Sequence, residues 1–481
     1  MRPNDPDTGA MAAHRAHRGR ARRRFVFGGV IALAFAAVGG AGTAPPTAAA
    51  TSIGELIAHA QPGATVLVPA GTYRERIVID KPLTLVGDGW PVIDAGRAGD
   101  VVLVTASDVT LRGFVVQGSG RDVVAEPAGI RVRADRATIE GNRLQDVLYG
   151  IMLEDSGGHR VSNNSIESVL EFSPERRGHA LYLWHTDGNR VEGNTVSGAK
   201  DGIFLGYATN THVERNHVSG ARYGIHYMYA DHNTFIDNVF RENMAGAAIM
   251  FSRDITFRGN EFAYSDSPAS GYGLLFKDVD DVEMSDNLVH HNRIGIMLEG
   301  APLTPGATVM LRRNLIGFND IALTIATTTA ATFTENSFTG NLEQVQITSA
   351  SAKHHNQWSL DGRGNHWDEY QGYDANGDGI GDIPFRYEGA FDELVRRNEW
   401  VRAYAFTPAR SALELAARWF PAYRPEPRVV DASPLLAPTI ELGRAGGGPE
   451  RSAVLALSAG LLLLPLFAWR QARAMRGSPW S

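Results

Sequence analysis

The sequence predicts an all-β fold: a right-handed parallel β-helix, a solenoid of about 22-residue coils, with a C-terminal helical extension and one C-terminal transmembrane helix. Three observations lead to this prediction. An asparagine returns at a regular spacing, a glycine recurs at a fixed distance after it, and a short run of alternating apolar residues follows the glycine. Alternation of this kind is typical of strands with one buried face.

The asparagine repeat defines the coil. Successive gaps are 22, 30, 22, 22, 22, 27, 27 and 22 residues, so a period of 22 is broken by three insertions. The repeat consists of Asn142, Asn164, Asn194, Asn216, Asn238, Asn260, Asn287, Asn314 and Asn336. Glycine recurs eight residues later at Gly150, Gly202, Gly224, Gly246 and Gly295.

A period of this length is shared by leucine-rich repeats and parallel β-helices. The segments lack a Leu-x-x-Leu-x-Leu string, and an asparagine in every coil can stack into a ladder of side-chain amides. We therefore predict a parallel β-helix over residues 51–390, with coils about 4.8 Å apart. Its first coil is expected to be capped by a short helix, because Ile53, Leu56, Ile57 and Ala60 form an amphipathic stripe.

Composition excludes several kinds of chemistry. The 481 residues include no cysteine, which rules out disulfides, Cys-ligated zinc, iron–sulfur clusters and thiol catalysis. Residues 51–451 carry 36 basic and 51 acidic side chains, a net charge of −15. Such a body should repel nucleic acid, so no nucleic-acid partner is expected.

Both ends of the chain carry membrane signals. Residues 1–50 are predicted to be an export signal, because Arg22-Arg23-Arg24 precede an apolar run and Ala48-Ala49-Ala50 offer a cleavage site. The same arginines fit twin-arginine export as well as ordinary secretion. Residues 452–469 contain no charge and are predicted to span the membrane, the alternative being a buried helix or a tail.

The basic residues within 470–481 predict a cytoplasmic tail. This topology places residues 51–451 outside the cytoplasm, in the periplasm or on the outer face of the cytoplasmic membrane.

One outward face of the solenoid is unusually apolar. Residues one and three positions after the repeat glycine are predicted to fill the core, and those two and four positions after it to point outward. The outward set is apolar and aromatic where polar residues are expected, which indicates a surface for a partner. This predicted partner surface comprises Met152, Tyr182, Trp184, His185, Phe204, Tyr207 and Tyr229.

A soft donor set lies on the same face. His226 and Met228 are two residues apart, and Met250 is predicted to lie one coil over Met228. Imidazole and thioether suit Cu(I), so these residues are candidate copper ligands. The alternative is that the inserted segment 170–178 covers this face and makes them ordinary packing. The adjacent pairs His290-His291 and His354-His355 are expected to be surface histidines with diverging side chains.

Beyond the repeats, residues 374–382 resemble a calcium loop. Oxygen ligands alternate at Asp374, Asn376, Asp378, Ile380 and Asp382, with glycine at the sixth position. The bidentate glutamate of an EF-hand is missing, because position twelve is Phe385. Calcium is the predicted ion, and the alternative is an acidic turn capped by its own side chains.

Two further segments follow. Residues 391–421 are predicted to form a helical docking segment, with helices over 392–404 and from Thr407-Pro408 to Pro421. Residues 422–451 are rich in proline and predict an extended connector toward the membrane.

With these motifs in place, the chain resembles the NosD family from about Thr51 to Pro438. The residues that carry the resemblance are Gly224-Ile225-His226-Tyr227-Met228-Tyr229, Gly246-Ala247-Ala248-Ile249-Met250-Phe251, Gly271-Tyr272-Gly273-Leu274-Leu275, Gly364-Asn365-His366-Trp367, Tyr373 through Pro384, and Val430 through Leu435. The resemblance implies an extracytoplasmic, non-enzymatic subunit of an assembly with an ABC-type ATPase and its membrane subunit. That assembly matures nitrous oxide reductase, supports copper and sulfur delivery to its copper–sulfide centre, and receives copper from a lipoprotein chaperone. The predicted span at 452–469 departs from the plain family pattern.

Two other functions compete with this one. β-Helix grooves often hold sugars, so a carbohydrate-active lyase, hydrolase or epimerase is one alternative, and an anchored surface-binding protein is the other. Glycoside hydrolysis needs two carboxylates across one groove, whereas the outward Glu154 and Glu299 are about six coils apart. Asp278, Asp280 and Asp281 cluster at a turn, where solvated charge is the simpler explanation. We therefore predict no catalytic residues.

Overall fold

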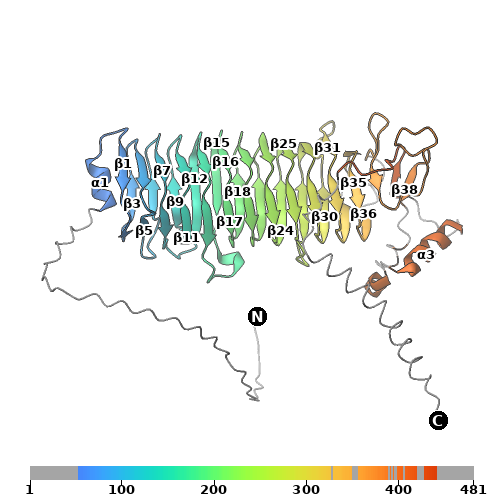
Figure 1. The fold of residues 1–481 in the computed structure, drawn as a ribbon, viewed down its shortest axis with the longest axis horizontal. Helices are drawn as coiled ribbons and strands as arrows, with labels where there is room; N and C mark the ends of the chain where they lie inside the picture. Colours follow the sequence, from blue (N-terminus) through green and yellow to red (C-terminus); the bar gives the residue numbers. More distant parts are fainter. Residues whose placement is uncertain are drawn as a thin grey trace, which may run out of the picture. The chain divides into compact units, whose positions relative to one another are not determined.

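The computed structural model describes residues 52–326, 329–348, 356–387, 391, 394, 398–404, 407–419 and 427–440. Three parallel sheets run along the solenoid (Figure 1), and neighbouring strands in each sheet come from successive coils. This arrangement confirms the predicted all-β parallel solenoid.

Each regular coil adds one strand to each sheet, here named A, B and C. Sheet A contains β1 (Thr65–Val68), β4 (Thr84–Gly87), β7 (Thr110–Arg112), β10 (Thr138–Glu140), β13 (Arg160–Ser162), β16 (Arg190–Glu192), β19 (His212–Glu214), β22 (Asn233–Ile236), β25 (Arg253–Arg258), β28 (Asp280–Ser285), β31 (Val309–Arg312) and β34 (Thr332–Thr334). Sheet B contains β2 (Thr72–Tyr73), β5 (Val92–Asp94), β8 (Val115–Gln117), β11 (Arg143–Val147), β14 (Ser165–Ser168), β17 (Thr195–Ser197), β20 (His217–Ser219), β23 (Val239–Arg241), β26 (Glu261–Ala263), β29 (Leu288–His290), β32 (Leu315–Gly317), β35 (Ser337–Thr339) and β37 (His366–Trp367). Sheet C contains β3 (Ile77–Ile79), β6 (Val102–Val104), β9 (Ala128–Val132), β12 (Tyr149–Gly157), β15 (Leu181–Asp187), β18 (Asp201–Gly206), β21 (Tyr223–Met228), β24 (Ala245–Met250), β27 (Tyr272–Lys277), β30 (Ile294–Glu299), β33 (Ile321–Ile325) and β36 (Glu343–Ile347).

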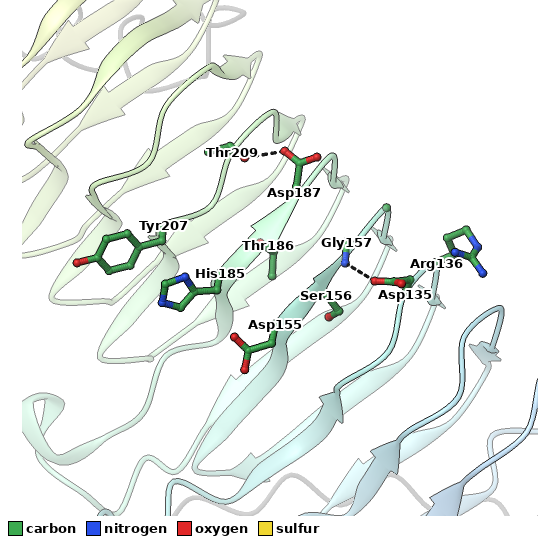
Figure 2. Close-up of a pocket in the computed structure, with 11 residues that line it drawn as sticks. Asp135, Arg136, Asp155, Ser156, Gly157, His185, Thr186, Asp187, Tyr207 and Thr209 are labelled. Carbon is green, nitrogen blue, oxygen red and sulfur yellow. Dashed lines mark hydrogen bonds between the residues drawn. The ribbon is translucent and has the colours of Figure 1, made fainter.

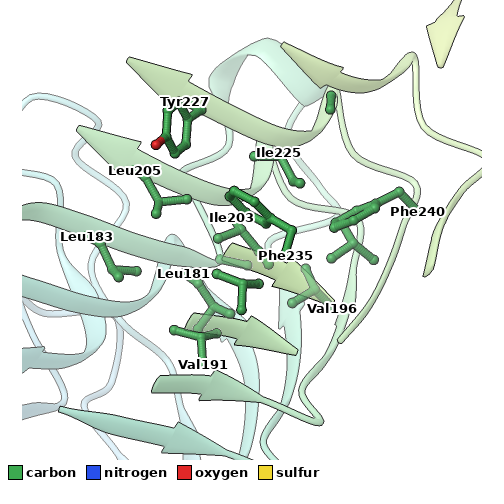
Figure 3. Packing of buried hydrophobic residues seen from close by; sticks show 14 of the residues in the cluster. Leu181, Leu183, Val191, Val196, Ile203, Leu205, Ile225, Tyr227, Phe235 and Phe240 are labelled. Atoms are coloured by element: carbon green, nitrogen blue, oxygen red, sulfur yellow. The ribbon is translucent and has the colours of Figure 1, made fainter. Parts of the chain in front are cut away.

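The core lies inside the coils, where residues at the same position of successive coils stack on one another. Residues one and three positions after the repeat glycine point inward as predicted, and Ile203, Leu205, Ile225 and Tyr227 are fully buried among them (Figure 3). Because alternate strand residues point to opposite faces, the residues between them point outward on sheet C.

The predicted asparagine ladder is present and forms the hydrogen-bonded spine of the solenoid. From Asn164 to Asn365, each Oδ1 accepts the backbone N–H of the asparagine one coil earlier at 2.8–3.0 Å. Each Nδ2 donates to a main-chain carbonyl, as Asn238 does to Val213 at 2.9 Å. Buried amide groups without such partners would cost about 1–3 kcal/mol each.

Two shorter ladders at other turns were not predicted. In the turn between sheets B and C, Asn319 accepts from the backbone of Asn292 and Asn341 accepts from that of Asn319, at 2.9 and 3.0 Å. In the turn between sheets C and A, Asn189 accepts from the backbone of His159 at 3.2 Å, and His159 Nδ1 accepts from Ala137 at 3.2 Å. His159 thus fills a rung that asparagine fills elsewhere.

This histidine makes the solenoid sensitive to acid. Burial lowers the pKa of His159 to about 4, against an ordinary value of 6.5, and the charge of Asp135 offsets this only in part. Above pH 6.5, His159 is neutral in both the folded and the unfolded chain, so it does not make the free energy of unfolding depend on pH. As the pH falls from about 6.5 to about 4 the unfolded chain binds the proton first, so about 3 kcal/mol of unfolding free energy should be lost.

We expect His159→Asn to remove most of this acid-linked loss, because an amide oxygen can accept the same N–H without titrating. Urea unfolding at pH 7.5 and 4.5 measures the difference, with the exposed His217→Asn as the matched control. An unchanged pH dependence in His159→Asn would contradict the assignment.

Both ends of the solenoid are capped. Helix α1 (Ile53–His59) begins after Ser52, whose side chain accepts from Glu55, and it buries Ile53 and Ile57 over the first coil as predicted. At the other end Asn365, the last asparagine of the ladder, donates its N–H to Asp431 at 2.7 Å.

The C-terminal cap uses part of the predicted connector 422–451. Strand β39 (Val429–Asp431) pairs antiparallel with β38 (Phe385–Tyr387), and Leu435 forms bridges to His366 and Ile380. Residues 427–440 therefore pack on the last coil instead of extending away from it. The physical reason is that buried Trp367 and Asn365 need the Asp431 carboxylate, to which both donate.

The segment between β38 and β39 is largely helical in its described parts. The 3-10 helix η3 (Glu399–Tyr404) lies within the predicted helix 392–404, and α3 (Pro408–Trp419) begins at Pro408 as predicted. Arg410 of α3 reaches Glu369 at 2.7 Å. Trp400 is 84% exposed, and the docking role of residues 391–421 stays a prediction.

The predicted export signal (1–50), membrane span (452–469) and tail (470–481) lie outside the described residues. No helix in the described part of the chain is long and apolar enough to cross a bilayer.

Candidate metal and partner surface

The candidate copper ligands share the outward face of sheet C. Parallel pairing places Met228 beside Met250 and His226 beside Phe204 and Ala248 in the neighbouring coils. All three candidate ligands are half-buried. The structure thus brings them onto one face in adjacent coils, as the repeat predicts, although no metal geometry is defined.

A buried carboxylate holds His226 in place. Nδ1 of His226 lies 2.8 Å from Oδ2 of Asp201, one coil earlier. The ring therefore donates from Nδ1 and keeps the lone pair of Nε2, which is the arrangement that orients histidine ligands in metal sites. Sequence reasoning missed Asp201, because other coils place tyrosine, alanine or isoleucine before the glycine.

Asp201 is the centre of a compact charge cluster. Its side chain is fully buried, Arg222 donates to both of its oxygens at 2.9 and 2.8 Å, and Nδ1 of His179 lies 3.1 Å away. Burial raises the pKa of Asp201, but the two histidines and Arg222 outweigh it and hold the pKa well below its ordinary value. Burial also lowers the pKa of His179, so this ring is neutral at physiological pH.

The predicted partner surface is only partly open. The inserted segment 170–178, which includes η1 (Pro174–Arg176), folds back over β12 and β15 of sheet C, where Phe172 and Tyr182 pack against the cluster that contains Met152. Met152 is fully buried and Phe204 is 8% exposed, so neither lies on an open surface, contrary to the prediction. The alternative, that segment 170–178 covers the outward face, is therefore correct for this end of the face.

Further along, aromatic rings form a ladder at the carboxyl end of sheet C, in which His185, Tyr207 and Tyr229 are exposed and Phe251 is half-buried. His185, Tyr207, Tyr229 and Phe251 stack coil upon coil, with centroids 4.7, 5.3 and 5.2 Å apart. All four have φ between 50° and 53°, a left-handed conformation that turns these side chains out of the strand alternation. We call these four residues the exposed ladder. Phe251 was not predicted.

Half-buried rings support this ladder from the sheet. Trp184 makes edge contacts with His185 and Tyr207 at 5.0 and 5.2 Å, and it stacks on Tyr182 at 6.2 Å. Tyr182 in turn stacks on Phe204 at 5.1 Å. Because most of these rings stack face to face on one another, mainly their edges are open to solvent.

An acidic groove borders the exposed ladder (Figure 2). It has a volume of about 640 Å³, and Asp155, His185 and Tyr207 line it in successive coils. The turn between sheets C and A and the strand ends beside it are rich in carboxylates, which come from Asp135, Asp155, Asp187, Asp231, Asp254, Asp278 and Asp281. Hydrogen bonds from Thr209 and Asn210 lower the pKa of Asp187, which keeps it ionised.

The predicted divergence of His290 and His291 is wrong. His290 is 4% exposed, and its Nδ1 lies 2.8 Å from Nδ1 of His291. The reason is that His291 leaves the strand with a φ of 55°, so strand alternation does not apply to it. The pair His354-His355 lies outside the described residues.

The predicted calcium loop is stabilised by its own backbone. Asp374 accepts from Gly377 and Gly379 at 2.6 and 2.8 Å, and Asp382 accepts from Ala375 at 2.7 Å. Across the described residues, no group of three or more His, Cys, Asp or Glu side chains is arranged to hold a metal ion. Calcium at this loop therefore stays a prediction.

Comparison with known proteins adds a family relationship. The family model described as "Periplasmic copper-binding protein (NosD)" matches residues 162–372. The "Probable ABC transporter binding protein NosD" of Pseudomonas aeruginosa is 33% identical over 76% of this chain and 87% of that protein. The protein of the same name from Stutzerimonas stutzeri is 31% identical over 77% of this chain and 86% of its own length.

Solved structures are more distant. The A-module of mannuronan C-5 epimerase AlgE6 from Azotobacter vinelandii is 13% identical and covers 62% of this chain and 90% of its own, with a TM-score of 0.49. The catalytic domain of a GH87 α-1,3-glucanase is 13% identical over 68% of this chain and 70% of its own, with a TM-score of 0.48. At this distance neither likeness carries an argument about activity.

Proposed function

Since the chain belongs to the NosD family, we propose that it is an extracytoplasmic, copper-handling subunit of an ABC-transporter-linked assembly that matures nitrous oxide reductase. The relatives named as ABC transporter binding proteins support the link to a transporter, and the family description supports a periplasmic location and copper binding. Copper is cargo in this proposal and is held only in transit.

One observation carries the proposal: His226 is fixed by a buried carboxylate beside two methionines on the same outward face. Nε2 of His226 and the sulfurs of Met228 and Met250 are soft, uncharged donors of the kind that select Cu(I). Hard cations such as Mg²⁺ and Ca²⁺ prefer oxygen ligands and would not compete for this set.

The copper proposal is tested by competition for Cu(I). We expect the full-length chain, titrated anaerobically under reducing conditions against a chromogenic Cu(I) chelator, to lose one tightly bound equivalent when His226, Met228 and Met250 are all replaced by alanine. Met297→Ala is the matched control, because Met297 is also a half-buried outward residue of sheet C. Equal stoichiometry in the wild type and the triple variant would refute the site.

The exposed ladder and its acidic border supply the docking surface in this proposal. Stacked aromatic rings are rigid, so a partner can bind them at little cost in side-chain entropy, and aromatic residues often dominate binding energy at interfaces. The carboxylates that follow the ladder favour a partner with a basic patch. The reductase and the copper chaperone are the proposed occupants.

We expect Tyr207→Ala combined with Tyr229→Ala to weaken binding of at least one of these two purified partners by tenfold or more, with steep salt dependence of the wild-type affinity. Trp90→Ala, which removes an exposed aromatic ring at a different turn, is the control: Tyr229 is 46% exposed and Trp90 is 40% exposed. Unchanged affinity for both partners would show that the ladder is not the docking surface.

The carbohydrate-enzyme alternative finds little support in the geometry. Glu154 is paired with Arg131 and Arg133 at 2.7 and 2.9 Å, and Glu299 is paired with Lys277. Paired carboxylates six coils apart cannot act on one glycosidic bond. The ring faces that sugars stack on are used within the ladder, which favours binding of a protein.

A further inference from the structure

A second cluster of ring nitrogens lies in the turn between sheets B and C, at the end of β29. His290 is buried, and its Nε2 lies 3.0 Å from Oε1 of Glu261, on the strand one coil earlier. Its other nitrogen, Nδ1, lies 2.8 Å from Nδ1 of the exposed His291.

The protonation of this cluster can be assigned from Glu261. Glu261 is also paired with Arg241, whose Nη2 donates to Oε2 at 2.7 Å. Glu261 is therefore a carboxylate that accepts, and the Nε2 of His290 carries the proton. The lone pair of a neutral His290 is then on Nδ1 and points at His291. A single proton lies between the two Nδ1 atoms.

Stacking on its neighbours sets the plane of the His291 ring but leaves the ring free to move within that plane. It stacks between Tyr264 and Phe318, with centroids 5.0 and 5.3 Å away and interplanar angles of 23° and 18°. The pair is thus oriented before any ligand arrives, as histidine ligands held by a carboxylate are in metal sites.

We propose that His290 and His291 form a second Cu(I) site, in which the proton between their Nδ1 atoms passes through solvent to Nε2 of His291 and the metal takes its place. The inference rests on the proposed function only in taking copper as the cargo. A metal about 2 Å from each nitrogen requires the two atoms to separate to at most about 4 Å, which a small rotation of the exposed His291 ring provides. Zinc is disfavoured because structural and catalytic zinc sites use three or four protein ligands, and the described residues offer only two here.

The location gives the site a role in transfer. It lies three coils beyond His226, about 14 Å along the solenoid at the usual strand spacing. One side of the pair is buried against Glu261 and the other faces solvent, so an incoming protein could add a third ligand to the copper and remove it. The two sites are far enough apart to be separated experimentally.

The test uses the full-length chain in which His226, Met228 and Met250 are replaced by alanine. Titrated with Cu(I) against the chromogenic chelator, this variant should retain one tight equivalent, and X-ray absorption should show two nitrogen scatterers and no sulfur. Adding His291→Phe should abolish that equivalent. Phenylalanine occupies the same turn position one coil later at Phe318, so the stack should survive, and an unchanged thermal unfolding curve checks this. Adding His217→Phe instead controls for loss of an exposed histidine.

The outcomes separate the two sites. If the background variant binds no Cu(I), or if its equivalent survives His291→Phe, the second site is wrong. If the wild type and the background bind equal amounts and His291→Phe removes copper from both, the sheet C site fails while the second site stands.

Discussion

Replacing Asn238 by alanine is expected to destabilise the solenoid by about 3–5 kcal/mol, the largest loss of stability we predict for one side chain. Oδ1 of Asn238 accepts from both the backbone N–H and Nδ2 of Asn216, each at 2.9 Å. Its own Nδ2 donates to Val213 and to Oδ1 of Asn260, each at 2.9 Å. Alanine leaves these buried groups without partners in a place that water cannot reach.

Urea unfolding monitored by circular dichroism measures this loss. Asn210→Ala is the control, because Asn210 is exposed and its side-chain amide bonds to Asp187 at the surface. A change below about 1 kcal/mol in Asn238→Ala would mean that the coils are held by core packing, with the amide ladder contributing little.

The second large effect is expected for Asp201→Ala. The variant leaves the half-buried Arg222, as well as His179 and His226, without the carboxylate between them. Removing one partner of a buried ion pair costs about 3–5 kcal/mol, and the partial exposure of Arg222 should bring the loss to the lower part of that range. Loss of a carboxylate that orients a histidine ligand should also weaken Cu(I) binding at the sheet C site by about 10–100-fold.

Denaturant unfolding and the Cu(I) competition titration together check this prediction. Asp187→Ala is the matched control, since Asp187 is an exposed carboxylate bonded to Thr209 and Asn210 in the next coil. If Asp201→Ala lost stability but kept full Cu(I) affinity, Asp201 would serve the fold alone and His226 would not be the ligand that it orients.

Much of the fold follows from the sequence because the same physical requirement recurs in every coil. An asparagine that must bond to the coil above and the coil below returns at a fixed spacing, and this gave the register that places Met250 beside Met228. The two shorter ladders were hidden because other residues interrupt them, with Thr211 and Ser265 occupying rungs that asparagine fills elsewhere.

The features that escaped prediction depend on three-dimensional detail. Asp201 pairs with a residue 25 positions later, a relation that no local pattern marks. Met152 is buried because an insertion folds back on it, and the sequence does not say where an insertion goes. The convergence of His290 and His291 depends on one left-handed residue, which reverses the direction that strand alternation assigns.

The replacement of asparagine by Asp431 at the last rung has a consequence for self-assembly. Every asparagine of the ladder both accepts and donates. The last asparagine of such a ladder can therefore bond to a further asparagine, including one from a second molecule. Asp431 accepts from Asn365 and Trp367 but has no amide hydrogen to offer onward. The asparagine ladder therefore ends in a side chain that cannot donate to a further asparagine. This ending disfavours end-to-end growth of molecules into fibres.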